Sequence, residues 1–114
     1  MIDVSRSDAG FVALVTIDVS DPAAHAPLLD LLSREVEQWV RHRPGFVSAN
    51  YHVSLDGSRI VNYAQWASEE DYRESFRSNP DAGSLRAAIT AIDGVDKLEM
   101  VGYTLARSIT AAPA

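Results

Sequence analysis

The sequence contains no cysteine, so disulfide bonds, thiolate nucleophiles and sulfur-ligated metals are excluded. It is also short of basic residues: 10 Lys and Arg stand against 16 Asp and Glu, which gives a net charge of -6 at pH 7. Nucleic-acid binding depends mainly on clustered Lys and Arg, and no basic stripe is present. We therefore expect no nucleic-acid partner.

Long apolar runs are missing as well. No stretch is long enough to span a bilayer, and the first residues, Met1 to Arg6, lack the basic and apolar regions of a signal peptide. We therefore expect a cytoplasmic protein without a membrane partner. The composition, 46% hydrophobic and 23% charged residues in a chain of 114, is typical of a globular protein. It predicts a single domain over residues 1–114, with a core of about 10–109.

Cofactor signatures are absent too. The sequence has no Gly-rich dinucleotide fingerprint, and its three histidines, His25, His42 and His52, lack the close spacing of a preformed metal site. We therefore expect neither a metal nor an organic cofactor. A redox enzyme of this kind would need a substrate that itself activates molecular oxygen, as electron-rich phenolates do.

Hydrophobic patterning predicts an alternation of strands and helices. The strands are expected at residues 11–19, 46–54, 59–66 and 97–108, the first helix from Pro22 to about His42, and a second helical region from Ser68 to Asp93-Gly94, interrupted at Asn79-Pro80. The order strand, helix, strand, strand, helix, strand is the split β-α-β motif. The expected fold class is therefore α+β, a ferredoxin-like βαββαβ domain with an antiparallel sheet.

The first strand is apolar on both faces, with Phe11, Val15 and Ile17 on one face and Val12 and Leu14 on the other. In a sheet whose helices cover only one side, such a strand needs a second cover on the other side. The simplest cover is the same sheet of a second subunit. We therefore expect a homodimer that closes a dimeric α/β barrel.

Four side chains form a candidate site. The period of two on the strand at 59–66 places Asn62 and Trp66 on one face, and Tyr72, in the first turn of the next helix, can lean over the same space. Arg86, at the edge of the later apolar stripe, can reach in as a cation. A mid-strand Asn is disfavoured by propensity and is costly if buried unpaired, so Asn62 is the hardest of the four to explain as packing.

Structural roles remain open for the other candidates. Trp66 and Tyr72 also suit a hydrophobic core, and Arg86 suits a solvated surface near Asp93. His52 lies on a hairpin strand and suits a catalytic base or a packed imidazole about equally well.

Parts of the sequence resemble the antibiotic biosynthesis monooxygenase family. The resemblance lies in two runs, Arg43-Pro44-Gly45-Phe46 and Asn62-Tyr63-Ala64-Gln65-Trp66, and in the single residues Tyr72 and Arg86. The resemblance covers almost the whole chain, and it implies a homodimeric ferredoxin-like barrel with a site between sheet and helices in each subunit. It also implies that molecular oxygen alone, as co-substrate, oxidises a tricyclic aromatic polyketide phenol to a para-quinone.

The resemblance also implies roles for individual residues. The catalytic residues would be Asn62, Trp66, Tyr72 and Arg86, and His52 would bind the substrate. Phe76, one turn from Tyr72 on the inner face of the same helix, is a further candidate for substrate binding. Two alternatives remain. A haem-degrading monooxygenase of the same superfamily would carry a haem-ligating His on the helix after the Trp strand, but no His follows Trp66. A non-catalytic small-molecule binding dimer is also compatible with the fold.

Overall fold

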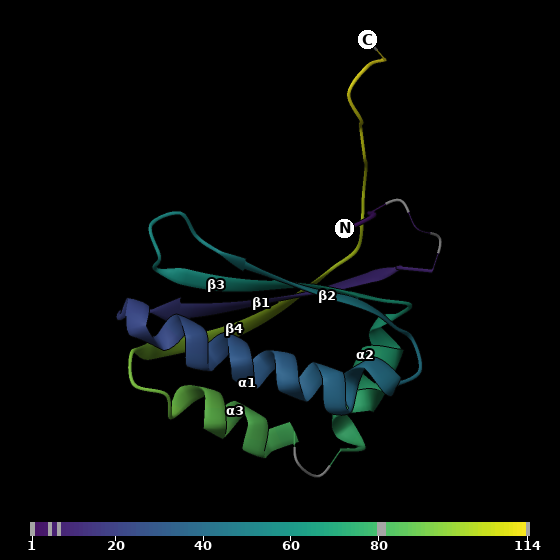
Figure 1. Ribbon diagram of the computed structural model, residues 1–114. Helices are drawn as coiled ribbons and strands as arrows, with labels where there is room; N and C mark the ends of the chain where they lie inside the picture. Colours follow the sequence, from purple (N-terminus) through teal and green to yellow (C-terminus); the bar gives the residue numbers. More distant parts are fainter. Residues whose placement is uncertain (1, 5, 7, 80–81, 114) are drawn as a thin grey trace.

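The computed structural model of the chain describes residues 2–4, 6, 8–79 and 82–113 (Figure 1). Among them, four strands form one antiparallel sheet in the order β2-β3-β1-β4. They are β1 (Phe11–Val19), β2 (Phe46–Val53), β3 (Arg59–Trp66) and β4 (Val95–Tyr103). The helices α1 (His25–Gln38), α2 (Glu69–Arg77) and α3 (Ala82–Thr90) cover one face of this sheet. The predicted ferredoxin-like α+β fold is confirmed.

The sequence predicts one continuous helix from Pro22 to about His42, but the structure divides this segment into three parts. A 3-10 turn (Pro22–Ala24) leads into α1, and a second 3-10 turn (Val40–His42) follows it. The division falls at Trp39, whose φ of -141° lies outside the helical region. None of the described helices is long and apolar enough to cross a bilayer.

Strand β4 starts at Val95 rather than Lys97 and ends at Tyr103 rather than Ser108. Its partner β1 begins at Phe11, and the register of the two strands ends with Val12 opposite Tyr103. Later residues have no strand to pair with, so 104–113 are exposed and extend away from the sheet (Figure 1).

The main core lies between the sheet and α1. Leu28 and Leu32 of α1 belong to one buried cluster with Ile17 of β1 and Ile60 of β3. Burying a side chain of this size stabilises the fold by roughly 1.5–3 kcal/mol, so the cluster fixes α1 across the sheet.

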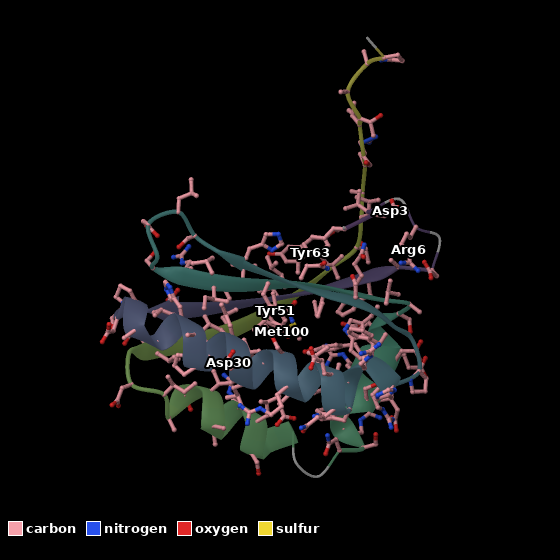
Figure 2. The ribbon with its side chains drawn as sticks, in the orientation of Figure 1. Asp3, Arg6, Asp30, Tyr51, Tyr63 and Met100 are labelled. Atoms are coloured by element: carbon pink, nitrogen blue, oxygen red, sulfur yellow. The ribbon has the colours of Figure 1, made fainter. Side chains whose placement is uncertain are left out.

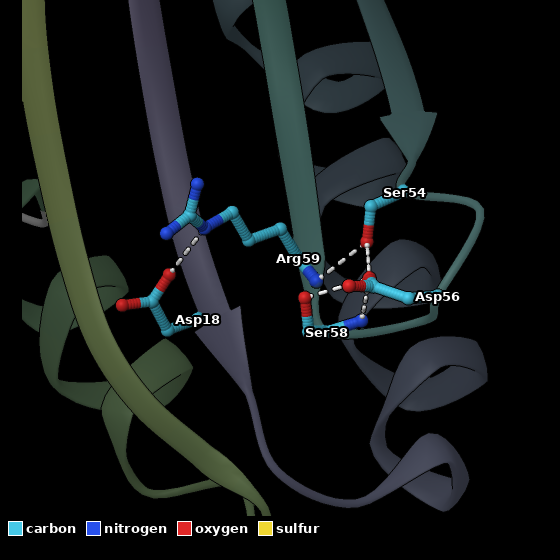
Figure 3. A network of polar contacts seen from close by, with 5 residues as sticks. All are labelled: Asp18, Ser54, Asp56, Ser58 and Arg59. Atoms are coloured by element: carbon cyan, nitrogen blue, oxygen red, sulfur yellow. Dashed lines mark hydrogen bonds and ion pairs between the residues drawn. The ribbon is translucent and has the colours of Figure 1, made fainter.

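The turn between β2 and β3 is held by one carboxylate. Asp56 accepts hydrogen bonds from the Ser54 hydroxyl at 2.8 Å, and from the backbone N–H and hydroxyl of Ser58 at 2.9 and 2.7 Å (Figure 3). The hydrogen bond from the Ser58 N–H, together with those from the two hydroxyls, lowers the pKa of Asp56 to about 2. Because turn geometry sets hairpin register, this network supports the pairing in which Tyr51 lies opposite Asn62.

The face of the sheet away from the helices is partly covered by the chain itself. Gln65 is only 2% exposed there, because its amide donates to the Asp3 carbonyl at 2.8 Å and accepts from the Ser48 hydroxyl at 2.8 Å. Val101 and Tyr103 of β4 share this outer face and are 42% and 49% exposed. The outer face therefore combines a covered end with exposed apolar side chains on one edge strand.

Gly45 connects the end of the first helical region to β2. Its φ of +84° lies in the left-handed region that favours glycine, and its carbonyl accepts a hydrogen bond from the Ala67 N–H at 2.7 Å. A Cβ at this position would overlap the Asp71 carboxylate at the start of α2. A glycine is thus required at position 45 for the start of α2 to pack against the beginning of β2.

The variant Gly45→Ala should lower the free energy of unfolding by at least about 1–2 kcal/mol, the cost of a left-handed conformation for a residue with a Cβ. The overlap with Asp71 adds to that cost. Chemical denaturation measures the change. Gly83→Ala is the matched control, because Gly83 is helical and a Cβ there meets nothing within 4 Å. The control should be neutral or stabilising by up to about 1 kcal/mol, and equal effects of the two substitutions would contradict this account.

Candidate active site

A cavity of about 390 Å³ lies between the sheet and the helices. This volume is within the range of small-molecule sites, roughly 300–1,000 Å³. Three alanines make room for it: Ala13, Ala64 and Ala49 are in register on β1, β3 and β2 and all line the cavity. Larger side chains in this row would fill the space, so small residues on neighbouring strands create the cavity.

Asn62 lines the cavity from the middle of β3, and the orientation of its amide is fixed. Its side-chain oxygen accepts a hydrogen bond from the backbone N–H of Asn50 at 3.1 Å. Since a backbone N–H only donates, the amide oxygen must face it. The NH₂ group has no hydrogen-bond partner among the described residues, and Asn62 thus offers a preset donor to a ligand.

Trp66 lines the same cavity and is 1% exposed. Its ring makes edge contacts with Phe46 and Tyr72, at centroid distances of 5.3 and 5.5 Å, and these contacts hold the plane of the indole. Within the described part of the chain its indole N–H has no hydrogen-bond partner. The donor is therefore available to a molecule in the cavity.

Tyr72 is positioned by the start of α2. Ser68 caps this helix by accepting from the Asp71 N–H at 3.1 Å. The phenol ring then packs on Phe76 at 4.9 Å, and burial raises the pKa of Tyr72, opposed by the charge of Arg73. Its hydroxyl has no partner among the residues described, so Tyr72 is a neutral donor near the cavity's aromatic end.

Arg86 is exposed on α3 and also lines the cavity, so its guanidinium lies where the cavity meets solvent. It donates to the Leu98 carbonyl at a long distance of 3.4 Å. The described residues show no ion pair between Arg86 and Asp93, the neighbour suggested by the sequence. Its position is that of a cation at the edge of the cavity.

The structure brings Phe76 to the cavity but leaves His52 outside it. His52 is exposed and lies opposite Val61, on the face away from the helices. Tyr51 lies opposite Asn62 and points to the helix side, as Figure 2 shows. His52 therefore does not line this cavity, unlike the expectation from the sequence. Strand alternation and the hairpin register place its neighbour Tyr51 there instead.

Sequence reasoning missed two polar lining residues, Tyr51 and Glu35. The Tyr51 hydroxyl donates to the Leu32 carbonyl at 3.4 Å, and burial raises the pKa of Tyr51 to about 12. Glu35 is half-buried on α1 and accepts a hydrogen bond from the Trp39 indole N–H at 2.5 Å. The hairpin register would have identified Tyr51, whereas the spacing of four between Glu35 and Trp39 indicates only that these two side chains are neighbours on the helix.

The arrangement is suited to a flat, largely apolar ligand with oxygen atoms. Aromatic rings supply the walls, and the Asn62, Trp66 and Tyr72 side chains supply hydrogen-bond donors. In the part of the chain that the structure describes, no group of three or more His, Asp or Glu side chains gathers to hold a metal ion.

Comparison with known proteins gives consistent relatives. Residues 10–87 match the family described as Antibiotic biosynthesis monooxygenase. Tetracenomycin-F1 monooxygenase of Streptomyces glaucescens is 48% identical over 73 residues, which are 64% of this chain and 64% of that protein. The match thus spans less than two thirds of that relative's length.

Two solved structures extend the comparison. The monooxygenase from the gene ActVA-Orf6 of Streptomyces coelicolor, in complex with the ligand nanaomycin D, is 39% identical with a TM-score of 0.88, covering 97% of this chain and 100% of that chain. SnoaB, a cofactor-independent oxygenase from Streptomyces nogalater, is 22% identical with a TM-score of 0.68, covering 90% and 100%, and shares the fold. Because the family match covers most of the chain and the Streptomyces coelicolor relative is similar along nearly all of it, this chain belongs to the antibiotic biosynthesis monooxygenase family.

Proposed function

We propose that the chain is a cofactor-independent monooxygenase that uses molecular oxygen to oxidise a phenolic aromatic polyketide of three rings to a para-quinone. The observation that carries this proposal is an apolar cavity with aromatic walls, into which Asn62, Trp66 and Tyr72 bring donors that have no partner among the described residues. Flat rings fit such walls, and substrate oxygens meet the donors. The similarity to Tetracenomycin-F1 monooxygenase and to the monooxygenase bound to nanaomycin D supports it.

The reaction that we propose needs no external reductant. The phenol loses a proton, and its electron-rich ring gives an electron to molecular oxygen. The resulting radicals combine into a peroxide on the ring, which breaks its O–O bond and loses water to leave the quinone. One oxygen atom enters the quinone and the other leaves as water, so the substrate itself supplies all the electrons.

Each donor has a role in this sequence. The Asn62 NH₂ group, fixed inside the cavity, and the Arg86 guanidinium at its edge stabilise the developing oxyanion, since both donors are in place where the charge develops. The Trp66 N–H holds the peroxide. Tyr72 supplies the proton for O–O cleavage, and its raised pKa keeps that proton in place until it is needed.

We propose that two copies of the chain associate through the outer faces of their sheets. Val101 and Tyr103 expose apolar surface on that face, and Leu105, 50% exposed, continues it into the extended tail. Apolar side chains gathered on one sheet face are typical of a protein interface. A homodimer would cover them.

Oxygen consumption tests the proposed reaction, with metal-free and flavin-free protein and an anthrone or 1,5-dihydroxynaphthalene as substrate. We expect uptake of one oxygen molecule per quinone formed. Tyr72→Phe should keep the fold and lower kcat on the order of a hundredfold, the loss of a general acid. Asn62→Ala should lower kcat by roughly 10²–10³ through the loss of one fixed donor.

The matched control is Tyr63→Phe, because Tyr63 is in the same strand as Asn62 but on the outer face (Figure 2). Its kcat should equal that of the wild type. Absence of oxygen uptake across a panel of phenols would favour the non-catalytic binding protein. A Soret band on adding haem, with haem consumed under reductant, would favour haem degradation instead.

Titration of Tyr72 tests its role as a proton donor. Burial disfavours the phenolate. Ultraviolet difference titration of wild type against Tyr72→Phe should therefore show that this phenol ionises at a pH above the ordinary pKa of tyrosine, which is about 10. Below that pH the neutral donor should persist. A midpoint at or below the ordinary value would be incompatible with a buried neutral donor.

The variant Val101→Lys should convert a homodimer to a monomer, because it places a charge in the proposed apolar contact. Size-exclusion chromatography with light scattering measures the mass. Leu55→Lys is the control, since Leu55 is fully exposed at the β2–β3 turn, outside the sheet face. A monomeric wild type, or a dimer that survives Val101→Lys unchanged, would argue against this interface.

A further inference from the structure

The polar groups that line the cavity differ in what they offer a ligand. Trp66 and Arg86 only donate hydrogen bonds, and Asn62 has only its NH₂ group free, because its oxygen is occupied by the Asn50 N–H. The neutral Tyr51 and Tyr72 hydroxyls can both donate and accept, but neither is a base. A phenol that is being oxidised, however, also brings a proton that needs a base.

Glu35 is the one carboxylate among the described residues that line the cavity, and a carboxylate only accepts. One of its oxygens, Oε2, accepts from the Trp39 indole N–H at 2.5 Å. The other, Oε1, has no hydrogen-bond partner within the described residues. Glu35 therefore offers the cavity one free acceptor on a tethered side chain.

The tether sets where this acceptor lies. The Trp39 ring packs edge-on against Phe76 at 5.4 Å, and Phe76 in turn packs on Tyr72 at 4.9 Å. The carboxylate is thus attached to the same aromatic cluster that positions the Tyr72 hydroxyl. Glu35 and Arg86 both line the cavity and form no ion pair with each other in the part described, so neither neutralises the other before a ligand enters.

A purely structural role, fixing Trp39 at the end of α1, uses only one of the two carboxylate oxygens. It does not require an anion, because a neutral amide oxygen would accept the same indole N–H. The free oxygen and the charge are the features that a ligand with an O–H group would use.

We propose that the Glu35 carboxylate accepts the hydrogen bond of the substrate's phenolic hydroxyl and takes its proton as the ring is oxidised. The inference rests on the proposed monooxygenase function and assigns the proton acceptor that this reaction needs. A phenol that has lost an electron is a far stronger acid than the phenol itself, so a carboxylate suffices as the base.

The step is balanced in atoms and charge. One electron passes from the phenol to molecular oxygen, giving superoxide, while the phenolic O–H bond breaks and its proton goes to Glu35. The products are a neutral aryloxyl radical, superoxide and the Glu35 carboxylic acid. After the two radicals combine into a ring peroxide anion, Tyr72 protonates its outer oxygen. Loss of the ring C–H proton, which returns to Tyr72, then breaks the O–O bond and releases hydroxide. The proton held on Glu35 converts this hydroxide to water and restores the carboxylate.

The variant Glu35→Gln separates the two roles, since its amide oxygen can still accept from Trp39 while its NH₂ group can neither accept nor take a proton. With 1,5-dihydroxynaphthalene, kcat should fall on the order of a hundredfold at unchanged thermal stability. Glu37→Gln, an exposed neighbour on the same helix, should behave as wild type. Wild-type turnover by Glu35→Gln, with Trp39→Phe impaired, would assign Glu35 a structural role and overturn the proposal.

Binding without turnover gives an independent readout. Under anaerobic conditions, tryptophan fluorescence reports the Kd of 1,5-dihydroxynaphthalene and of its dimethyl ether. Wild type should bind the diol at least about tenfold more tightly than the ether, a difference that hydrogen bonds to charged groups commonly supply, and Glu35→Gln should reduce this preference severalfold. A preference that is equal in both proteins overturns the proposal.

These two readouts also separate failure of the inference from failure of the proposed function. If wild type binds the diol with a Glu35-dependent preference but consumes no oxygen with any phenol, the monooxygenase function fails and the hydroxyl acceptor stands. If Glu35→Gln does not fold, Glu35→Asp replaces it, because the shorter side chain retains the charge but moves the carboxylate away from the ligand. Glu35→Asp should then lower both the diol preference and kcat, and wild-type values for both would overturn the proposal.

Discussion

The fixed register of β3 between β1 and β2 is the constraint on which the site depends. Side chains alternate along each strand, so a slip of one residue would move Asn62 to the outer face. Two features hold the register. The Asp56 network closes the β2–β3 turn, and the pairing of Ala13 with Ala64 continues an antiparallel ladder that runs the length of β1. The face of the sheet on which Asn62 and Trp66 lie is therefore set by backbone pairing.

Helix packing then divides the space above the sheet into two regions. At one end, Leu28 is fully buried among aliphatic contacts, and Leu32 of the same cluster also lines the cavity. At the other end, the row that includes Ala13 and Ala64 is too small to fill it, and the ring of Trp66 closes that end against α2. The same helices thus provide the stability of the fold at one end and an open cavity at the other. Keeping a cavity forgoes packing energy, because close contacts stabilise an interior far better than empty space does.

How far the sequence predicts this structure depends on the range of the interactions involved. Placement of Asn62 and Trp66 on one face needs only the alternation within a single strand, and the cap of α2 needs only Ser68 and Asp71; both are local and were predictable. The choice between His52 and Tyr51 depends on the pairing of two strands across a turn, which periodicity alone does not fix. Glu35 was hidden for another reason: it lies beside the apolar stripe of α1, where a helix normally turns its charges to solvent.

The distribution of donors and acceptors in the cavity restricts its ligand more narrowly than its shape does. A donor near apolar walls is costly to leave unpaired, by about 1–3 kcal/mol where water is excluded, so Asn62, Trp66 and Tyr72 together favour a ligand rich in oxygen acceptors. A purely accepting ligand would leave the free oxygen of Glu35 without a partner, and an apolar hydrocarbon would leave every group unpaired. A molecule with carbonyl or peroxide oxygens toward the donors and one hydroxyl toward the carboxylate satisfies all of them. Oxidation of a phenol produces such a distribution along its course, because oxygen acceptors appear on the ring while the hydroxyl proton departs.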